Sequence, residues 1–202
     1  MTLRERLKGW MPVVVIVAVA AVGGVVAIPL GGWDTVQLQS RVLPEQPIGE
    51  SLEGARFTTS IDDAYLTDTN PDGYSSPEVG TTYLVVVATL ENVTDTPQIP
   101  LGGTELPPFV VPGVFGLGDS LGIDDYSAYL QRDGSFGPTL MPGVPDTVLF
   151  VFPVWRTTFQ DGDEVRVGLT DAAAEEADIY EGTRWANEHL VAEVPVVLRR
   201  EP

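Results

Sequence analysis

The sequence predicts a mainly β protein in which one N-terminal transmembrane helix precedes an antiparallel β-sandwich. Residues 11–30 form an unbroken run of twenty residues without a charged side chain, which is typical of a membrane-spanning helix. The chain also contains 21 Gly and 17 Pro, more than a helical bundle accommodates, so we expect many turns between short strands. From residue 55 onward apolar and polar residues alternate, which is the period of a β-strand.

The apolar run at residues 11–30 is long enough to cross a bilayer. At a rise of about 1.5 Å per residue, a helix of this length spans the ~30 Å hydrocarbon core. A cleaved signal peptide is the alternative, but its apolar region is usually only ~7–15 residues long and ends at a small-residue cleavage site. We therefore expect an uncleaved signal-anchor that holds the chain in the lipid bilayer.

The residues that flank this run predict its orientation. Arg4, Arg6 and Lys8 give the N-terminal tail a net positive charge, and basic residues beside a span are retained in the cytoplasm. Trp10 and Trp33 bracket the run, where their amphipathic rings prefer the two membrane interfaces. We therefore expect a single-pass plasma-membrane protein with its N-terminus in the cytoplasm and its C-terminal domain outside the cell.

The expected organisation has four parts, defined by composition and charge. They are a cytoplasmic tail at residues 1–10, a transmembrane helix at 11–30, a juxtamembrane spacer at 31–54 and a β-rich domain at 55–200. The spacer is expected because it contains few long apolar runs and includes prolines.

The part of the chain beyond the span is strongly acidic and contains no cysteine. Residues 31–202 carry a net charge of −20, and this field repels phosphate backbones and anionic lipid headgroups. We therefore expect no nucleic-acid partner, whereas cations and basic protein surfaces would be attracted. Without cysteine the chain has no disulfide, no thiol nucleophile and no lipidated-cysteine anchor.

The first expected strands lie between residues 55 and 92. Phe57, Ile61 and Tyr65 are spaced to share one face of an extended segment. A turn-rich loop follows from Thr67 to Gly80. Residues Tyr83–Leu90 are apolar on both faces, which suits a central strand that is covered on both sides.

The later strands follow a long connection rich in Pro and Gly. Val148–Phe152 is apolar on both faces and is expected to end at Pro153. The composition of Asp171–Glu181 favours one or two helical turns. Pro195 lies inside the last expected strand, so that strand is predicted to be an edge strand or to carry a bulge. Three further sets of residues alternate as strand faces do: Tyr126, Ala128 and Leu130; Val165, Val167 and Leu169; and Leu190, Ala192, Val194, Val196 and Leu198.

Three of these features resemble a known family when they are taken in order. Tyr83–Leu90 is followed by Glu91-Asn92, then comes the turn Leu140-Met141-Pro142-Gly143, and then the strand end Phe150-Val151-Phe152-Pro153. This order resembles the telokin-like, immunoglobulin-like ectodomains of Gram-positive, actinobacterial-type surface proteins and lipoproteins, over roughly residues 50–199. The resemblance implies an immunoglobulin-like β-sandwich. It implies no assigned activity, and the chain departs from many relatives because it lacks their lipidated cysteine.

One loop resembles the first half of a calcium-binding loop. Asp68, Asn70 and Asp72 stand at positions one, three and five, and Gly73 follows at position six for the sharp turn. The glutamate expected at position twelve is replaced by Val79. An acidic loop that uses Asp, Asn, Pro and Gly for turn geometry explains the same residues. We expect no cofactor, with Ca²⁺ at this loop as the alternative.

No motif in the sequence indicates catalysis. His189 is the only histidine, strand alternation directs it outward, and no nucleophile motif accompanies it. The acidic turns at Asp124–Asp125 and Asp161–Glu164 are typical of solvated loops. Trp155 and Trp185 are expected to pack in the domain, with a carbohydrate-stacking platform as the alternative.

The function that follows is a non-catalytic, extracytoplasmic interaction module. Its partner would be a cell-envelope component or a membrane protein complex, because the anchor keeps the domain beside the membrane and no catalytic constellation is present. A ligand- or Ca²⁺-binding domain is the alternative. A hydrolase built on scattered carboxylates is a further alternative, since 28 acidic residues follow the span and none of them is singled out as a pair.

Overall fold

The structure is a computed structural model that describes residues 42–73, 75–100, 107–116, 126–176 and 183–201. The chain separates into two units, and the second, Leu43–Pro202, contains nearly all of the described residues. The predicted span at 11–30 and its flanking residues Arg4, Arg6, Lys8, Trp10 and Trp33 lie outside them. Within the described part of the chain, no helix has the length and hydropathy needed to cross a membrane.

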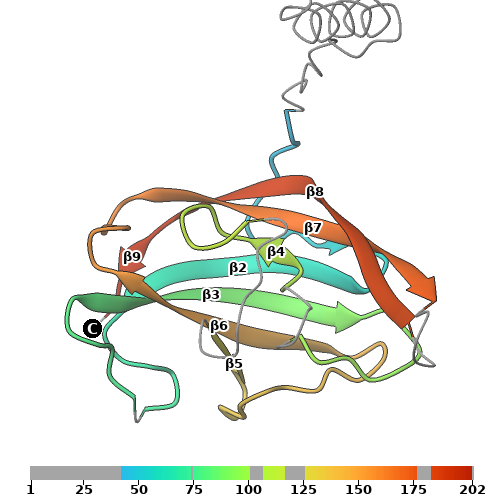
Figure 1. Ribbon diagram of the computed structural model, residues 1–202, viewed down its shortest axis with the longest axis horizontal. Helices are drawn as coiled ribbons and strands as arrows, with labels where there is room; N and C mark the ends of the chain where they lie inside the picture. The colour runs from blue at the N-terminus through green and yellow to red at the C-terminus, as the bar shows by residue number, and fades with distance from the viewer. Residues whose placement is uncertain (1–41, 74, 101–106, 117–125, 177–182, 202) are drawn as a thin grey trace, which may run out of the picture. The chain divides into compact units, whose positions relative to one another are not determined.

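The described residues form nine β-strands and are mainly antiparallel, as expected. The strands are β1 (Leu52–Glu53), β2 (Phe57–Thr67), β3 (Thr81–Asn92), β4 (Phe109–Val110), β5 (Ser127–Leu130), β6 (Pro145–Trp155), β7 (Glu164–Glu176), β8 (Thr183–Val197) and β9 (Arg199–Arg200). Six strands form one sheet in the order β1-β2-β3-β6-β5, with β9 paired to β2 in parallel, and the other three form a sheet in the order β4-β7-β8 (Figure 1).

The centre of the larger sheet is formed by β3 and β6, and both strands are apolar on two faces. Every second residue of β3 joins the main core, namely Leu84, Val86, Ala88 and Leu90. Val85 and Val87 face the other way. Strands β2 and β6 pair with β3 on its two sides. The expectation of a central buried strand at Tyr83–Leu90 is therefore confirmed.

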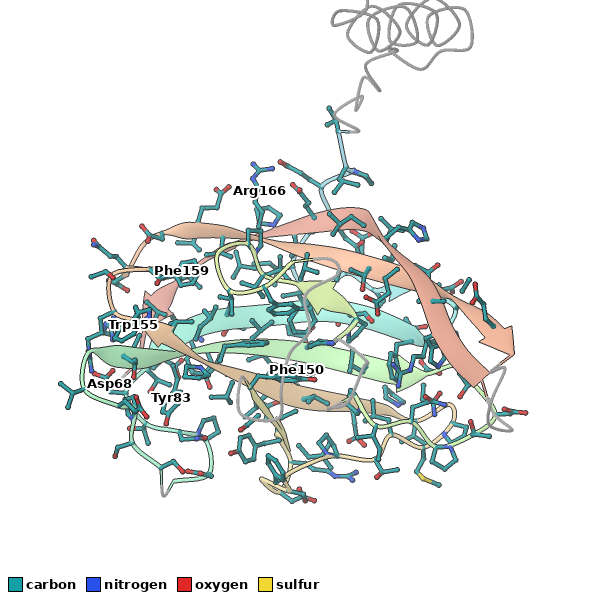
Figure 2. All side chains as sticks on the ribbon, viewed as in Figure 1. Asp68, Tyr83, Phe150, Trp155, Phe159 and Arg166 are labelled. Carbon is teal, nitrogen blue, oxygen red and sulfur yellow. The ribbon has the colours of Figure 1, made fainter. Side chains whose placement is uncertain are left out.

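The main core lies between the two sheets and is rich in aromatic rings. Phe109 from β4 meets Phe150 from β6 edge to face, with ring centroids 5.0 Å apart. Tyr126 stacks on Phe152 at 5.5 Å, and both residues are buried. Such pairs are worth ~0.5–1.5 kcal/mol beyond the burial of their area. Figure 2 shows Phe150 in this interior position. We call the face of the larger sheet that packs on this core its inner face.

Strand β2 contains a β-bulge that changes which side chains share a face. Its ladder pairs Ile61 and Asp63 with consecutive residues of β3, so Asp62 is the extra residue. Two residues on the bulged strand oppose one on its partner, and alternation shifts by one beyond that point. Phe57 and Ile61 enter the main core, but Tyr65 lies on the opposite face. The expectation that Tyr65 shares their face is therefore wrong.

Strands β7 and β8 form a long hairpin. Val165, Val167 and Leu169 are buried on one face of β7, which confirms the alternation expected there. Helical turns were expected at Asp171–Glu181, but β7 continues as a strand to Glu176, because pairing with β8 outweighs the helix propensity of a short alanine-rich stretch. The rest of that segment lies outside the described residues.

Two prolines are accommodated where a strand lacks a partner on one side. Pro195 lies in β8, an edge strand of the smaller sheet, as expected. Pro153 does not end β6, which continues to Trp155. The first residue of its neighbour β5, Ser127, pairs with Val151, so among the described residues Pro153 lies beyond the β5–β6 ladder. The missing N–H of Pro153 is therefore tolerated.

A buried asparagine fixes the corner at the end of β3. The amide of Asn92 donates to the carbonyl oxygens of Thr96 and Leu140, at 2.7 and 3.0 Å. Its side-chain oxygen accepts from the main-chain N–H of Thr94 at 2.9 Å. The N–H of Gly143 reaches the Asn92 carbonyl at 2.8 Å, and Gly143 has a φ of +67°, which favours glycine. Asn92 thus joins the end of β3 to the turn at Leu140–Gly143, two of the features that the sequence singles out.

The folded unit includes part of the segment expected to be a spacer. It begins at Leu43, and the N–H of Gln46 donates to the carbonyl of Glu193 in β8 at 2.8 Å. Strand β1 also lies within this segment and pairs with β2. The sandwich therefore extends N-terminal to residue 55, and the chain enters it beside the smaller sheet.

Candidate interaction face

The outer face of the larger sheet carries an apolar cluster. Its buried members are Tyr83, Val85, Val87, Tyr129 and Val151, and the partly buried Tyr65 and Leu149 pack against them. We call these seven residues the outer cluster. One face of an antiparallel sheet in a sandwich is usually solvated and polar. Here the chain itself buries five of the seven residues, and Tyr65 and Leu149 leave part of their surface exposed to solvent.

A hollow of about 380 Å³ lies beside this cluster, and we call it the acidic hollow. It is lined by Asp62, Asp63, Tyr65, Val87, Gln131, Thr147, Leu149, Arg199 and Glu201. These residues come from β2, β3, β6, the residue after β5 and the C-terminal segment. The hollow thus spans the sheet from one side to the other.

The β-bulge places two consecutive carboxylates in this hollow. Regular alternation would direct Asp62 and Asp63 to opposite faces of β2. Because Asp62 is the extra residue, Asp63 pairs opposite Val87 of the outer cluster, and Asp62 reaches Thr89 on the same face. Bulges often re-aim side chains beside functional sites.

Three hydroxyl groups are arranged around Asp62. Ser60 donates to one carboxylate oxygen at 2.8 Å, and Thr89 donates to the other at 2.6 Å. The Thr89 and Thr147 hydroxyl oxygens are 3.0 Å apart. Thr89 has one proton and gives it to Asp62, so Thr147 must be the donor to Thr89. Two protons therefore point toward the carboxylate, and the Thr147 proton points toward the Thr89 oxygen.

Arg199 holds the other two carboxylates of the hollow. Its guanidinium makes two hydrogen bonds with Asp63, one of them at 2.9 Å, and contacts Glu201 at 3.0 Å. The guanidinium carbon also lies 5.8 Å from the centre of the Tyr65 ring. Burial raises the pKa of the Tyr65 phenol, Glu201 and Asp63 raise it further, and Arg199 opposes them.

A second hollow, of about 400 Å³, lies on the other side of the outer cluster. It is lined by Asn70, Ser75, Ser76, Pro77, Glu78, Thr81, Tyr83, Tyr126, Ser127, Val151 and Pro153. Burial raises the pKa of Tyr83, and a hydrogen bond with Asn70 opposes that shift. The two hollows flank one apolar cluster, and together they form what we call the interaction face.

The predicted calcium-loop residues all have protein partners. Asp68 accepts from the Thr82 hydroxyl at 2.8 Å and forms ion pairs with Arg156 at 2.8 Å and Arg200 at 3.6 Å. The Thr82 hydrogen bond contributes most to lowering the Asp68 pKa, and Arg156 adds to it.

The other two predicted ligands serve the geometry of the loop. Asn70 is buried, and its side-chain oxygen accepts from the N–H of Asp72 at 3.2 Å. Asp72 in turn accepts from the N–H and hydroxyl of Ser75, at 2.9 and 2.6 Å. Across the residues that the structure describes, no group of three His, Cys, Asp or Glu side chains is placed to hold a metal ion.

The remaining candidates lie apart from the interaction face. His189 is exposed on β8, opposite Asp171 of β7. Trp155 ends β6 and is 64% exposed, whereas Trp185 of β8 pairs opposite Ala174, near the end of β7. These two strand ends lie at opposite ends of the domain (Figure 1), so the two residues do not form one platform. Asp161 and Gly162 form the expected turn, and Glu164 is already the first residue of β7. Asp124–Asp125 lies outside the described residues.

Sequence reasoning missed the acidic hollow because its residues are joined by pairing that is distant in sequence. Asp63 and Arg199 are separated by 136 positions, and the short parallel contact between β9 and β2 brings them together. The one available signal was the pair Asp62-Asp63 inside an otherwise alternating strand, which indicates a bulge.

Comparison with known proteins yields structural likeness only. No family model and no curated protein matches the chain. An uncharacterised β-sandwich protein from Clostridium difficile 630 is 12% identical, with 75% of this chain and 93% of that chain covered and a TM-score of 0.39. A protein from Staphylococcus aureus that is described as a presumed lipoprotein is 7% identical, with 78% and 97% covered and a TM-score of 0.32.

Proposed function

We propose that this chain is a membrane-anchored, non-catalytic interaction module that acts outside the cell. Residues 11–30 would hold it in the lipid bilayer of the plasma membrane with the N-terminus in the cytoplasm. The interaction face would then engage a cell-envelope component or a membrane protein complex. The proposal includes the resemblance to telokin-like, immunoglobulin-like surface domains. That resemblance rests on three features of the sequence: the strand end at Glu91-Asn92, the turn at Leu140–Gly143 and the segment Phe150–Pro153.

The observation that carries the proposal is the outer cluster. Tyr65 and Leu149 are only partly buried, and the smaller sheet packs on the opposite, inner face. Tyrosine supplies a large, rigid and amphipathic contact surface at a low cost in conformational entropy. A partner that covers this face would remove the exposed parts of the cluster from water, at ~25 cal/mol per Å² of apolar surface.

Anchoring would support this role by raising the local concentration. A domain tethered to the membrane meets its membrane partners at an effective concentration that can reach the millimolar range. A contact of modest intrinsic affinity is then sufficient. The net charge of −20 on residues 31–202 favours partners with basic surfaces and disfavours nucleic acid.

The first test is partner capture from native membranes by the full chain. Leu149→Glu adds a charge to the outer cluster, and Val197→Glu makes the same change at a 63%-exposed position on β8. We expect both variants to fold, and only Leu149→Glu to lose the proteins that the wild-type chain captures. Loss of those proteins in both variants, or in neither, would contradict the assignment to this face.

The second test concerns the anchor and its orientation. We expect the full chain to remain in membranes after alkaline extraction, and protease added to intact cells to digest the acidic domain. A mature chain that begins beyond residue 30, or a domain that is protected in intact cells, would refute this topology.

A further inference from the structure

We propose that the acidic hollow receives an arginine or lysine side chain from a basic, extended segment of the partner. This inference rests on the proposed function, because it names the chemistry by which the interaction face would recognise that partner. The hollow offers charge, hydrogen-bond acceptors and an apolar wall in one place.

The charge balance of the hollow is negative. Asp62, Asp63 and Glu201 line it together with a single cation, Arg199. Arg199 contacts both Asp63 and Glu201. Among the residues that the structure describes, no cationic side chain is paired with Asp62. A cation from outside would therefore complete the charge balance at Asp62.

The hydroxyl groups of the hollow present acceptors to such a cation. Because Thr147 donates to Thr89 and Thr89 donates to Asp62, the Thr147 oxygen keeps its lone pairs for another donor. A guanidinium has five N–H donors and an ammonium has three, and neither has an acceptor. A ligand rich in hydrogen-bond donors therefore fits the hollow. An anion does not, because Asp62 and Thr147 would present it with acceptor oxygens and no donor.

Arg199 already shows how a guanidinium is held here. It makes two bonds to Asp63 and lies 5.8 Å from the Tyr65 ring, which combines a carboxylate with a cation–π contact. Val87 and Leu149 supply an apolar wall for the methylene stem of a second basic side chain. The adjoining outer cluster would pack against the apolar neighbours of that side chain.

The dimensions favour a peptide segment over a lone ion. The hollow of about 380 Å³ is open and crosses four strands, and no metal-binding group of three His, Cys, Asp or Glu occurs in the described part of the chain. The partner that fits these observations is a protein segment in which basic and apolar side chains alternate.

The test uses a fluorescent peptide of alternating arginine and valine, with a control peptide in which neutral citrulline replaces arginine. Binding to the full chain in a zwitterionic detergent is followed by fluorescence anisotropy at physiological salt. Asp62→Asn is compared with Glu164→Gln, which removes the same charge from an exposed residue of the smaller sheet. Glu201→Gln is a second hollow variant that leaves the hydroxyl groups around Asp62 intact, should Asp62→Asn fold poorly.

We expect the arginine peptide to bind and the citrulline peptide to bind at least tenfold more weakly. Asp62→Asn and Glu201→Gln should each raise the Kd about tenfold, the loss of one charge-assisted contact, whereas Glu164→Gln should change it less than twofold. Equal effects of all three substitutions would show diffuse attraction to an acidic protein and would overturn the inference.

The failure of this inference can be distinguished from failure of the proposed function. If Leu149→Glu abolishes capture of the native partner but Asp62→Asn does not, the interaction face stands and the basic-segment inference is wrong. Suppose instead that Asp62→Asn and Glu201→Gln weaken binding of the arginine peptide, but Leu149→Glu does not reduce capture of the native partner. The hollow then binds basic segments, and the proposed partner face is wrong.

Discussion

The substitution Asn92→Ala tests whether the corner at the end of β3 stabilises the sandwich. The Asn92 side chain makes three hydrogen bonds to main-chain groups, with Thr96, Leu140 and Thr94. In the variant, the Thr96 carbonyl would still accept from the Thr94 hydroxyl, and the Leu140 carbonyl would still accept from the N–H of Gln98. The full cost of an unsatisfied buried carbonyl therefore does not apply. Each lost bond should cost ~1 kcal/mol, or ~3 kcal/mol in all.

Thermal and urea unfolding of the full chain measure this loss. For a domain of this size, ~3 kcal/mol corresponds to a decrease of ~6–12 °C in Tm, a large part of a typical stability of ~5–15 kcal/mol. The matched control is Thr94→Val, which removes one partly exposed hydroxyl from the same corner. We expect it to cost ~1 kcal/mol or less. If Asn92→Ala costs no more than Thr94→Val, the corner does not depend on the Asn92 amide.

Three further predictions follow from contacts elsewhere in the domain. Gly168→Ala would place a methyl group 2.9 Å from a Val110 methyl carbon and 2.5 Å from the tip of Leu190, so we expect a loss of ~1–3 kcal/mol in urea unfolding; an unchanged midpoint would show that both neighbours move freely. The lowered pKa of Asp68 means that its contacts stabilise the fold above the ordinary value of 3.8 and are lost as pH falls through the folded-state pKa. Asp68→Asn should therefore cost up to ~1 kcal/mol at pH 7 and nothing at pH values below that pKa, and a difference that persists in acid would contradict this cause. Because arginines hold Asp68, we expect the same unfolding midpoint in calcium and in chelator; a higher midpoint in calcium would show that the Asp68–Asp72 loop binds the ion.

Features that depend on the pattern within one strand were predictable from the sequence. The continuous apolar run of β3 indicated a strand covered on both faces, and the alternation at Val165–Leu169 indicated which face of β7 is buried. Helix propensity gave the wrong prediction at Asp171–Glu176. A short alanine-rich stretch prefers helix only when no partner strand pairs with it, and here β8 does.

The interaction face could not be predicted from the sequence, because it depends on the register between strands that are distant along the chain. Nothing local shows that Arg199 reaches Asp63, or that Asp62 reaches a threonine of β3. The calcium-like spacing of Asp68, Asn70 and Asp72 was visible, but the arginines that hold Asp68 come from the ends of two other segments. Local patterns thus predict elements and turns, whereas the site is formed by the pairing of those elements.

The extra residue of the β2 bulge, Asp62, contributes to the acidic hollow but is not needed for the packing of the fold. If Asp62 were deleted, Ile61 would be followed directly by Asp63, and every later residue of β2 would keep its present partner on β3. The inward positions of Ala64 and Leu66 and the outward position of Tyr65 would also be unchanged. Packing therefore gives no reason for the extra residue, which interrupts the ladder and adds a carboxylate to the outer face. Deletion of Asp62 also removes the acceptor of the Ser60 and Thr89 hydroxyls, so the unfolding free energy should fall by no more than ~2 kcal/mol, while binding of the arginine peptide falls about tenfold, as expected for Asp62→Asn. A deletion variant that fails to fold would show that the bulge serves the sheet itself.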